Sequence, residues 1–90
     1  MSLPEPSSPL SLVDASIGER YVVSRVRPSP MSDDWERWLE ELGFVPGERV
    51  SLMARGFPGG DPLVVRVGLS TFALRQAEAA CVEVAVETSA

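Results

Sequence analysis

Three carboxylates, Asp33, Glu36 and Glu40, have the spacing needed to share one face of a helix. Residues three and four apart on a helix are neighbours, so carboxylate oxygens at these positions could hold a divalent cation. Softer transition metals prefer nitrogen and sulfur ligands, and the chain has no histidine and a single cysteine. The sequence therefore favours a solvated helix face that binds divalent metal weakly at most, and it predicts no required cofactor.

Catalysis finds little support in the same side chains. Histidine is the commonest general base, and none is present. Cys81 has no candidate base in view, and its apolar neighbours are typical of a small buried side chain. The sequence thus predicts a protein that is not an enzyme.

Net charge disfavours two classes of ligand. The 90 residues carry a formal charge of −5, and a surface of that sign repels nucleic-acid phosphates and anionic lipids at long range. No apolar run approaches the ~20 residues of a membrane-spanning helix, and the N-terminus lacks the pattern of a secretory signal. We therefore expect a cytoplasmic protein that neither binds nucleic acid nor inserts into a membrane.

One short helix is predicted from the stretch SDDWERWLEELGF. Its apolar stripe has the spacing i, i+3, i+4 and i+7 and consists of Trp35, Trp38, Leu39 and Leu42. Asp33 is the expected N-cap and Gly43 the expected left-handed C-cap. We expect Trp38 and Leu42 to be buried, whereas Trp35, in the first turn, is either part of the core or a partly exposed contact.

Five short strands are predicted, one before this helix and four after it, and each contains a run of apolar residues. They are RYVVSRVR before the helix and RVSLMAR, PLVVRV, TFALR and CVEVAV after it. The buried face of the first strand is ambiguous; Val50, Leu52 and Ala54 are expected to face inward in the second, and Glu83 outward in the last. Five short twisted strands bury their apolar faces best as a small β-barrel. The predicted organisation is a mobile tail over 1–11, a barrel domain over 12–87 and a short tail over 88–90.

The phrase Gly-Glu-Arg occurs twice, and each copy precedes a strand. Val45-Pro46-Gly47-Glu48 has the chemistry of a type II turn, with proline at its second position and glycine at its third. Gly18 closes an equivalent turn before the first strand. We interpret the echo as one structural device used twice rather than as a duplicated domain.

The loop GFPGGD, residues 56–61, interrupts the strands with three glycines and a proline. Phe57 within it either covers the barrel or serves as an exposed contact, and we favour the contact because loops carry much of the binding in small barrels. Together with Trp35 and the outward-facing Arg55, it forms the predicted partner surface, since aromatic and arginine side chains are typical of interface centres.

The stretches LGFVPGERVSL, FPGGDPLVVRV and ALRQAEAACVEV, in that order and spacing, resemble the FeoA family of bacterial ferrous iron transport proteins. The likeness runs from about Asp14 to Val86. It implies an SH3-like β-barrel and a non-catalytic, cytoplasmic accessory that regulates a FeoB-type transporter, and it allows a location at the inner membrane through that partner. The alternative, from another class, is a sensor that binds a divalent metal through the carboxylates Asp33, Glu36 and Glu40.

Overall fold

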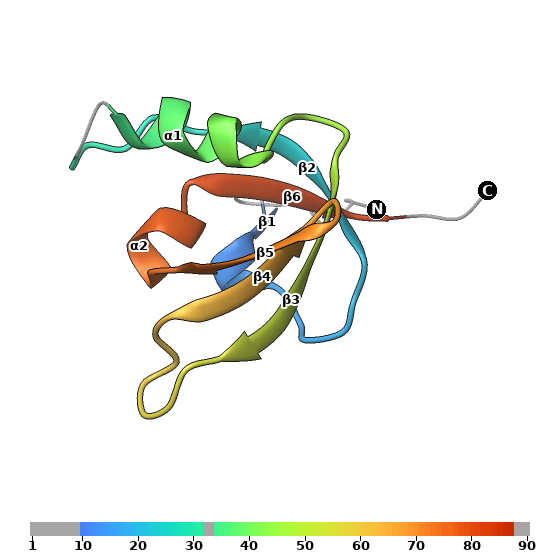
Figure 1. The fold of residues 1–90 in the computed structure, drawn as a ribbon, viewed down its shortest axis with the longest axis vertical. Helices are drawn as coiled ribbons and strands as arrows, with labels where there is room; N and C mark the ends of the chain where they lie inside the picture. Colours follow the sequence, from blue (N-terminus) through green and yellow to red (C-terminus); the bar gives the residue numbers. More distant parts are fainter. Residues whose placement is uncertain (1–9, 32–33, 88–90) are drawn as a thin grey trace, which may run out of the picture.

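The computed structural model describes residues 10–31 and 34–87, which form mainly one antiparallel sheet (Figure 1). The strand order is β1-β6-β2-β3-β4-β5, with β1 and β5 at the edges. The strands are β1 Leu10–Ser11, β2 Tyr21–Val26, β3 Arg49–Arg55, β4 Leu63–Val67, β5 Ser70–Leu74 and β6 Val82–Val86. A 3₁₀ turn, η1 Leu12–Asp14, and two helices, α1 Asp34–Leu42 and α2 Gln76–Ala79, complete the fold. The predicted mainly β class is confirmed, as are its five strands and its short helix after RYVVSRVR.

Strand β1 corrects the predicted N-terminal boundary. Leu10 pairs with Val84 and Ser11 with Glu83, so the last two residues of the predicted tail, 1–11, are part of the sheet. The strand has only two residues, too few for a periodic pattern, and pairing with β6 rather than local propensity fixes it. The rest of the predicted tails, residues 1–9 and 88–90, lies outside the described residues.

The ambiguous face of β2 has a simple cause. The register of β2 against β6 shifts between Val23 and Arg25, which marks a β-bulge. A bulge moves the following side chains to the other face of the sheet. Tyr21 and Val23 are therefore buried before the bulge, and Val26 is buried after it although it has the opposite parity.

A second bulge overturns the expected burial of Ala54. The register of β3 against β4 shifts between Leu52 and Ala54, so the inward alternation of Val50 and Leu52 stops there. Ala54 is exposed. In β4 the alternation is unbroken, and Leu63, Val65 and Val67 are all buried as predicted.

Helix α1 ends as its sequence predicts. Gly43 has φ +117°, its N–H donates to the Glu40 carbonyl at 3.0 Å, and the Phe44 N–H donates to the Leu39 carbonyl at 3.1 Å. These two bonds are the Schellman motif, which needs a residue of positive φ after the helix. Phe44 then enters the core, where its ring lies 6.2 Å from that of Phe72 on β5.

The buried stripe of α1 is narrower than predicted. Leu39 is fully buried, but Trp38 is 38% exposed, so the expected burial of Trp38 is wrong. Trp35 and Leu42 are partly buried and pack against the core instead. The helix thus leans on the sheet along Trp35, Leu39 and Leu42, with Trp38 at the margin of that stripe.

The remaining turns and Cys81 agree with the sequence. Gly18 and Gly47 have φ +87° and +91°, and the Glu48 N–H donates to the Val45 carbonyl at 3.0 Å, which closes the predicted turn around Pro46 and Gly47. Cys81 is a free, buried thiol. No helix among the described residues is long and apolar enough to cross a membrane.

Glu83 is buried, not outward and solvated as expected. Its residue exposure is 8%. Strand β1 pairs beside it, and its carboxylate lies 3.0 Å from Nε of Arg27 and 3.8 Å from Nε of Arg25. A covered carboxylate is tolerated when it is paired, so the added strand and the two arginines account for the difference.

Candidate functional site

The loop between β3 and β4, residues 56–62, is held in one shape by its own backbone. The Gly56 N–H donates to the Pro62 carbonyl at 2.7 Å, and the Gly60 N–H donates to the Gly56 carbonyl at 2.9 Å. A Cβ atom on Gly56 would overlap the carbonyl group of Asp61. Glycine is therefore required where the two arms of the loop meet.

Helix α2 holds the same loop from the side. The backbone N–H of Gln76 donates to Oδ1 of Asp61 at 3.0 Å, and Nε2 of Gln76 donates to the Gly59 carbonyl at 2.9 Å. The Asp61 carboxylate thus satisfies a free N–H in the first turn of α2. With both internal and external bonds, the loop is ordered before any partner arrives.

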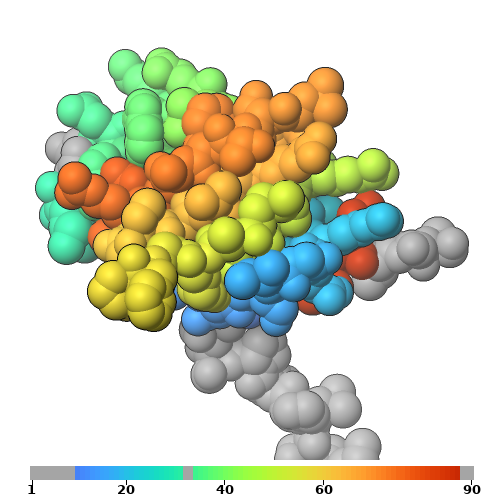
Figure 2. All heavy atoms as spheres, turned by 60° about the horizontal axis from the view of Figure 1, so that its bottom comes forward, coloured from blue at the N-terminus to red at the C-terminus, as the bar shows by residue number. Residues whose placement is uncertain are grey.

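Phe57 lies in this loop directly after Gly56 and is 97% exposed. Figure 2 shows the loop, in yellow, projecting at the lower left of the molecule. A phenyl ring in water forfeits the burial free energy that drives folding, and solvated aromatic side chains on fixed loops suit binding. The exposure agrees with an exposed contact and not with a cover over the barrel.

Trp35 does not share a surface with Phe57. In Figure 1, α1 lies at the top and the β3–β4 loop at the bottom, with the sheet between them. Trp35 packs against the core, so much of its ring already contacts this chain and cannot contact a partner. The predicted partner surface is therefore not one continuous area, and Phe57 is the aromatic member that remains available.

Arg55, the third member, braces the chain. Its guanidinium Nη2 donates to the carbonyl of Val13 at 2.8 Å and to that of Ala15 at 2.9 Å. Both acceptors lie at the end of η1, on a segment some forty residues away in sequence. A guanidinium with two carbonyl acceptors is held in place, and this position assigns Arg55 a structural role beside the loop.

The predicted metal ligands form no centre that the structure describes. Glu36 and Glu40 lie one turn apart on α1, whereas Asp33 lies outside the described residues. Across residues 10–31 and 34–87, no three acidic, cysteine or histidine side chains gather closely enough to hold a metal ion. Glu40 is exposed and Glu36 is half-buried, and the solvated, weakly metal-binding helix face stays a prediction.

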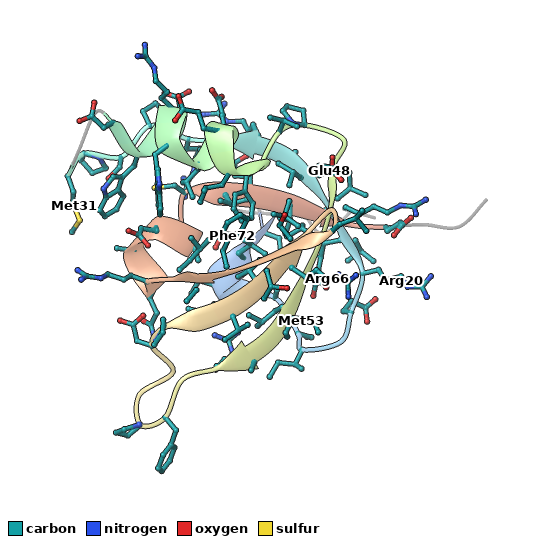
Figure 3. The ribbon with its side chains drawn as sticks, viewed as in Figure 1. Arg20, Met31, Glu48, Met53, Arg66 and Phe72 are labelled. Carbon is teal, nitrogen blue, oxygen red and sulfur yellow. The ribbon has the colours of Figure 1, made fainter. Side chains whose placement is uncertain are left out.

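A basic groove with a volume of about 310 Å³, outside the predicted partner surface, lies on the outer face of the sheet. Its basic lining consists of Arg20, Arg49 and Arg66, and we refer to it as the arginine groove. Figure 3 shows Arg20 and Arg66 at the same end of the sheet, away from the β3–β4 loop. Outward positions of β3 and β4 were predictable from their alternation, but Arg20 joins them only through the register of β2.

Comparison with known proteins places this architecture. The FeoA domain model matches residues 10–86. FeoA of Stenotrophomonas maltophilia, an SH3 domain protein crystallised with zinc, has 42% identity and a TM-score of 0.76 over 84% of this chain and 89% of its own. Comparison with curated proteins gave no significant match.

Two solution structures agree with the first match. Iron(II) transport protein A of Clostridium thermocellum has 31% identity and a TM-score of 0.74, over 86% of this chain and 45% of its own. FeoA of Chlorobium tepidum has 28% identity and a TM-score of 0.73, over 88% and 71%. Since the domain model spans nearly all described residues and the Stenotrophomonas structure matches both sequence and fold, the chain belongs to the FeoA family, with that family's small SH3-like barrel.

Proposed function

We propose that this chain is a cytoplasmic, non-catalytic interaction module that regulates a ferrous iron transporter of the FeoB type. Family membership supports the link to ferrous iron transport. The Stenotrophomonas relative has itself been described as a candidate bacterial ferrous iron transport activating factor. An accessory with no catalytic centre must act by contact, so its function depends on a surface that the fold leaves free.

The observation that carries the proposal is the state of Phe57. The residue is 97% exposed on a loop that is bonded within itself and to α2. Binding through a preorganised loop avoids much of the entropy cost of ordering it. A rigidly held aromatic ring is the kind of side chain that interface hot spots favour. We infer that Phe57 inserts into an apolar pocket on the transporter's cytosolic side.

Capture of the transporter from detergent-solubilised membranes tests this inference. Phe57→Ala should weaken capture of a FeoB-type transporter by about 1–2 kcal/mol, the size of a moderate hot spot. The matched control is Leu69→Ala, because Leu69 is 94% exposed at the tip of the β4–β5 hairpin and is equally apolar. It should leave capture unchanged.

The two variants separate a specific contact from general stickiness. Equal loss of capture in both would show that exposed apolar area alone is responsible, and the role of Phe57 would be wrong. If the wild-type protein fails to capture the transporter both with and without GTP, the accessory function itself is contradicted. Far-UV circular dichroism should be the same for all three proteins.

A divalent-metal sensor is the alternative, and one observation favours it: the Stenotrophomonas relative was crystallised in complex with zinc. Glu36 and Glu40, one turn apart on α1, would supply oxygen ligands, with Asp33 nearby in the sequence. Calorimetric titration with Fe²⁺ and Zn²⁺ distinguishes the two proposals. Micromolar, stoichiometric binding that is lost in Glu36→Gln/Glu40→Gln would favour the sensor.

A further inference from the structure

The arginine groove has an orderly origin in the strand register. Extending the Tyr21–Val50 register by one residue places Arg20, the residue directly before β2, opposite Ser51. Ser51 in turn pairs with Arg66 on β4. Arg20, Ser51 and Arg66 therefore form one row across β3, β4 and the residue that precedes β2. All three alternate with the buried residues Tyr21, Val50 and Val65, so the row faces outward.

Two of the three arginines are free to bind a ligand. Arg49 has an ion pair, because its Nε lies 3.2 Å from a carboxylate oxygen of Glu87 on the chain beyond β6. Throughout the part of the chain that the structure describes, no hydrogen bond or ion pair engages the guanidinium of Arg20 or of Arg66. The groove thus holds two uncommitted guanidinium groups beside one that is partly neutralised.

This local charge opposes the charge of the whole protein. The chain as a whole has a formal charge of −5, whereas the groove is lined by three arginines and one carboxylate, that of Glu87, with the Glu48 carboxylate next to Gly68 at its rim. Like charges gathered without partners raise the free energy of the free protein, and a ligand of opposite sign relieves that repulsion. The groove therefore selects an anionic ligand.

The groove lacks the donors that phosphate sites use. Phosphates are typically held by backbone N–H groups at helix ends or in loop nests. Here most lining residues lie in the strands of the sheet, and the N–H groups of Gly68 and Glu87, outside the strands, donate to the carbonyls of Arg49 and Arg20, both at 3.0 Å. The arginine side chains are therefore the main donors left to bind the anion. Guanidinium groups match carboxylates through two parallel hydrogen bonds.

The spacing indicates more than one carboxylate. Arg20 directly precedes β2 and Arg66 lies on β4, on either side of Ser51 on β3, and two inter-strand spacings amount to roughly 10 Å between their backbones. An extended peptide covers that distance in about three residues. A segment with several acidic side chains can therefore engage both arginines at once, with a separate carboxylate for each.

We propose that the arginine groove binds an extended acidic segment of a partner protein. The proposal rests on the proposed function in one respect, because it takes the partner to be a protein. The groove lies where β3 begins and the Phe57 loop follows where β3 ends, so a large partner can contact both. The acidic segment adds charge complementarity and orientation to the apolar contact of Phe57.

Octaglutamate labelled with fluorescein is the probe for a direct test by fluorescence anisotropy. The wild-type protein should bind it at low salt and progressively lose it as salt is added, since exposed charges are screened beyond about 10 Å at 0.1 M. Arg20→Glu/Arg66→Glu should weaken binding at least about tenfold, because each reversal turns attraction into repulsion. Neither side chain supports the fold, so the melting temperature should be kept.

The matched control is Arg37→Glu/Arg75→Glu, which makes the same change in net charge at exposed positions outside the groove lining. Compared at 0.1 M salt, where the Debye length is about 10 Å, it should bind octaglutamate within about twofold of wild type. Equal loss in both double variants would mean that net charge alone decides binding, and the groove proposal would fail. Absence of octaglutamate binding to the wild-type protein would overturn it as well.

Two further arms separate this proposal from its neighbours. If inorganic pyrophosphate displaces octaglutamate more effectively than triglutamate does, the groove is a phosphate site and the acidic-segment proposal is wrong. If the wild-type protein binds octaglutamate but captures no transporter, the accessory function fails while the groove stands. Loss of both octaglutamate binding and transporter capture in Arg20→Glu/Arg66→Glu would support the groove as part of the transporter contact.

Discussion

Helix α1 and the β3–β4 loop each carry an aromatic residue that the sequence assigns to partner binding, yet the fold uses the two differently. Trp35 on α1 packs against the core, whereas Phe57 on the loop is 97% exposed. The helix presents its stripe to the sheet because its periodicity leaves an apolar face to bury. The loop has no such face, and its bonds to α2 hold it away from the barrel.

The contrast shows how the same residue type acquires two roles. An aromatic side chain in the apolar stripe of a helix packs toward the core, and the other residues of the stripe determine how much of it is buried. An aromatic side chain in a glycine-rich loop reaches the core only if the loop folds inward. Here Gly56 brings the two arms of the loop together at its base, and Phe57 projects beyond them.

The largest expected effect comes from disrupting the close approach of the two arms at the base of the loop. Gly56→Ala places a Cβ against the backbone of Asp61, which cannot move without breaking the Gly56–Pro62 hydrogen bond. Forced overlap in a packed site costs about 1–3 kcal/mol, and we expect the upper end because backbone atoms are involved. Chemical denaturation measures the change in the free energy of unfolding.

Gly59→Ala is the control in the same loop. Its added Cβ meets no atom within 4 Å, but Gly59 has φ +88°, so it should lose only the roughly 1–2 kcal/mol of a left-handed conformation. Equal destabilisation in the two variants would show that the close approach at Gly56 is unimportant. The conclusion that the close approach at Gly56 holds the loop in one shape would then be wrong.

The next effect concerns α1. Trp35→Ala removes a partly buried ring that packs against the core, and we expect about 1–3 kcal/mol of destabilisation, below the range for a fully buried tryptophan. Trp38→Ala should cost less, since Trp38 is 38% exposed. Thermal melting of the two variants checks the order. A larger effect at Trp38 would restore the stripe that the sequence predicted.

The features that the sequence predicted correctly depend on local chemistry. Pro46 and Gly47 form their turn, Gly43 ends α1 in a Schellman motif, and Cys81 is buried. Each needs only a few adjacent residues, so the signal lies within a short window.

The features that it missed depend on contacts between distant segments. The β2 and β3 bulges place Val26 inward and Ala54 outward, and a bulge has no signature in alternation alone. Strand β1 forms by pairing with β6, and Glu83 on β6 is covered because β1 pairs beside it. The arginine groove needs the register of three strands. Residue type alone is compatible with either face of the sheet at these positions. The pairing between strands determines which face each side chain occupies.

The smallest expected effect tests the third residue of the predicted partner surface, Arg55. Its two hydrogen bonds to the carbonyls of Val13 and Ala15 hold the end of η1 beside β3. Hydrogen bonds to charged groups contribute about 1.5–3 kcal/mol, and partial solvent exposure reduces this, so Arg55→Met should destabilise the fold by about 1 kcal/mol. Arg66→Met removes the same charge from a side chain without such bonds and should change stability by less than about 0.5 kcal/mol.

Both variants are measured by chemical denaturation, with transporter capture as a second readout. A brace at Arg55 predicts lost stability with capture by the folded protein intact, because the brace lies between segments of the same chain. Full stability with lost capture would instead return Arg55 to the partner surface, next to Phe57 on the loop that follows it.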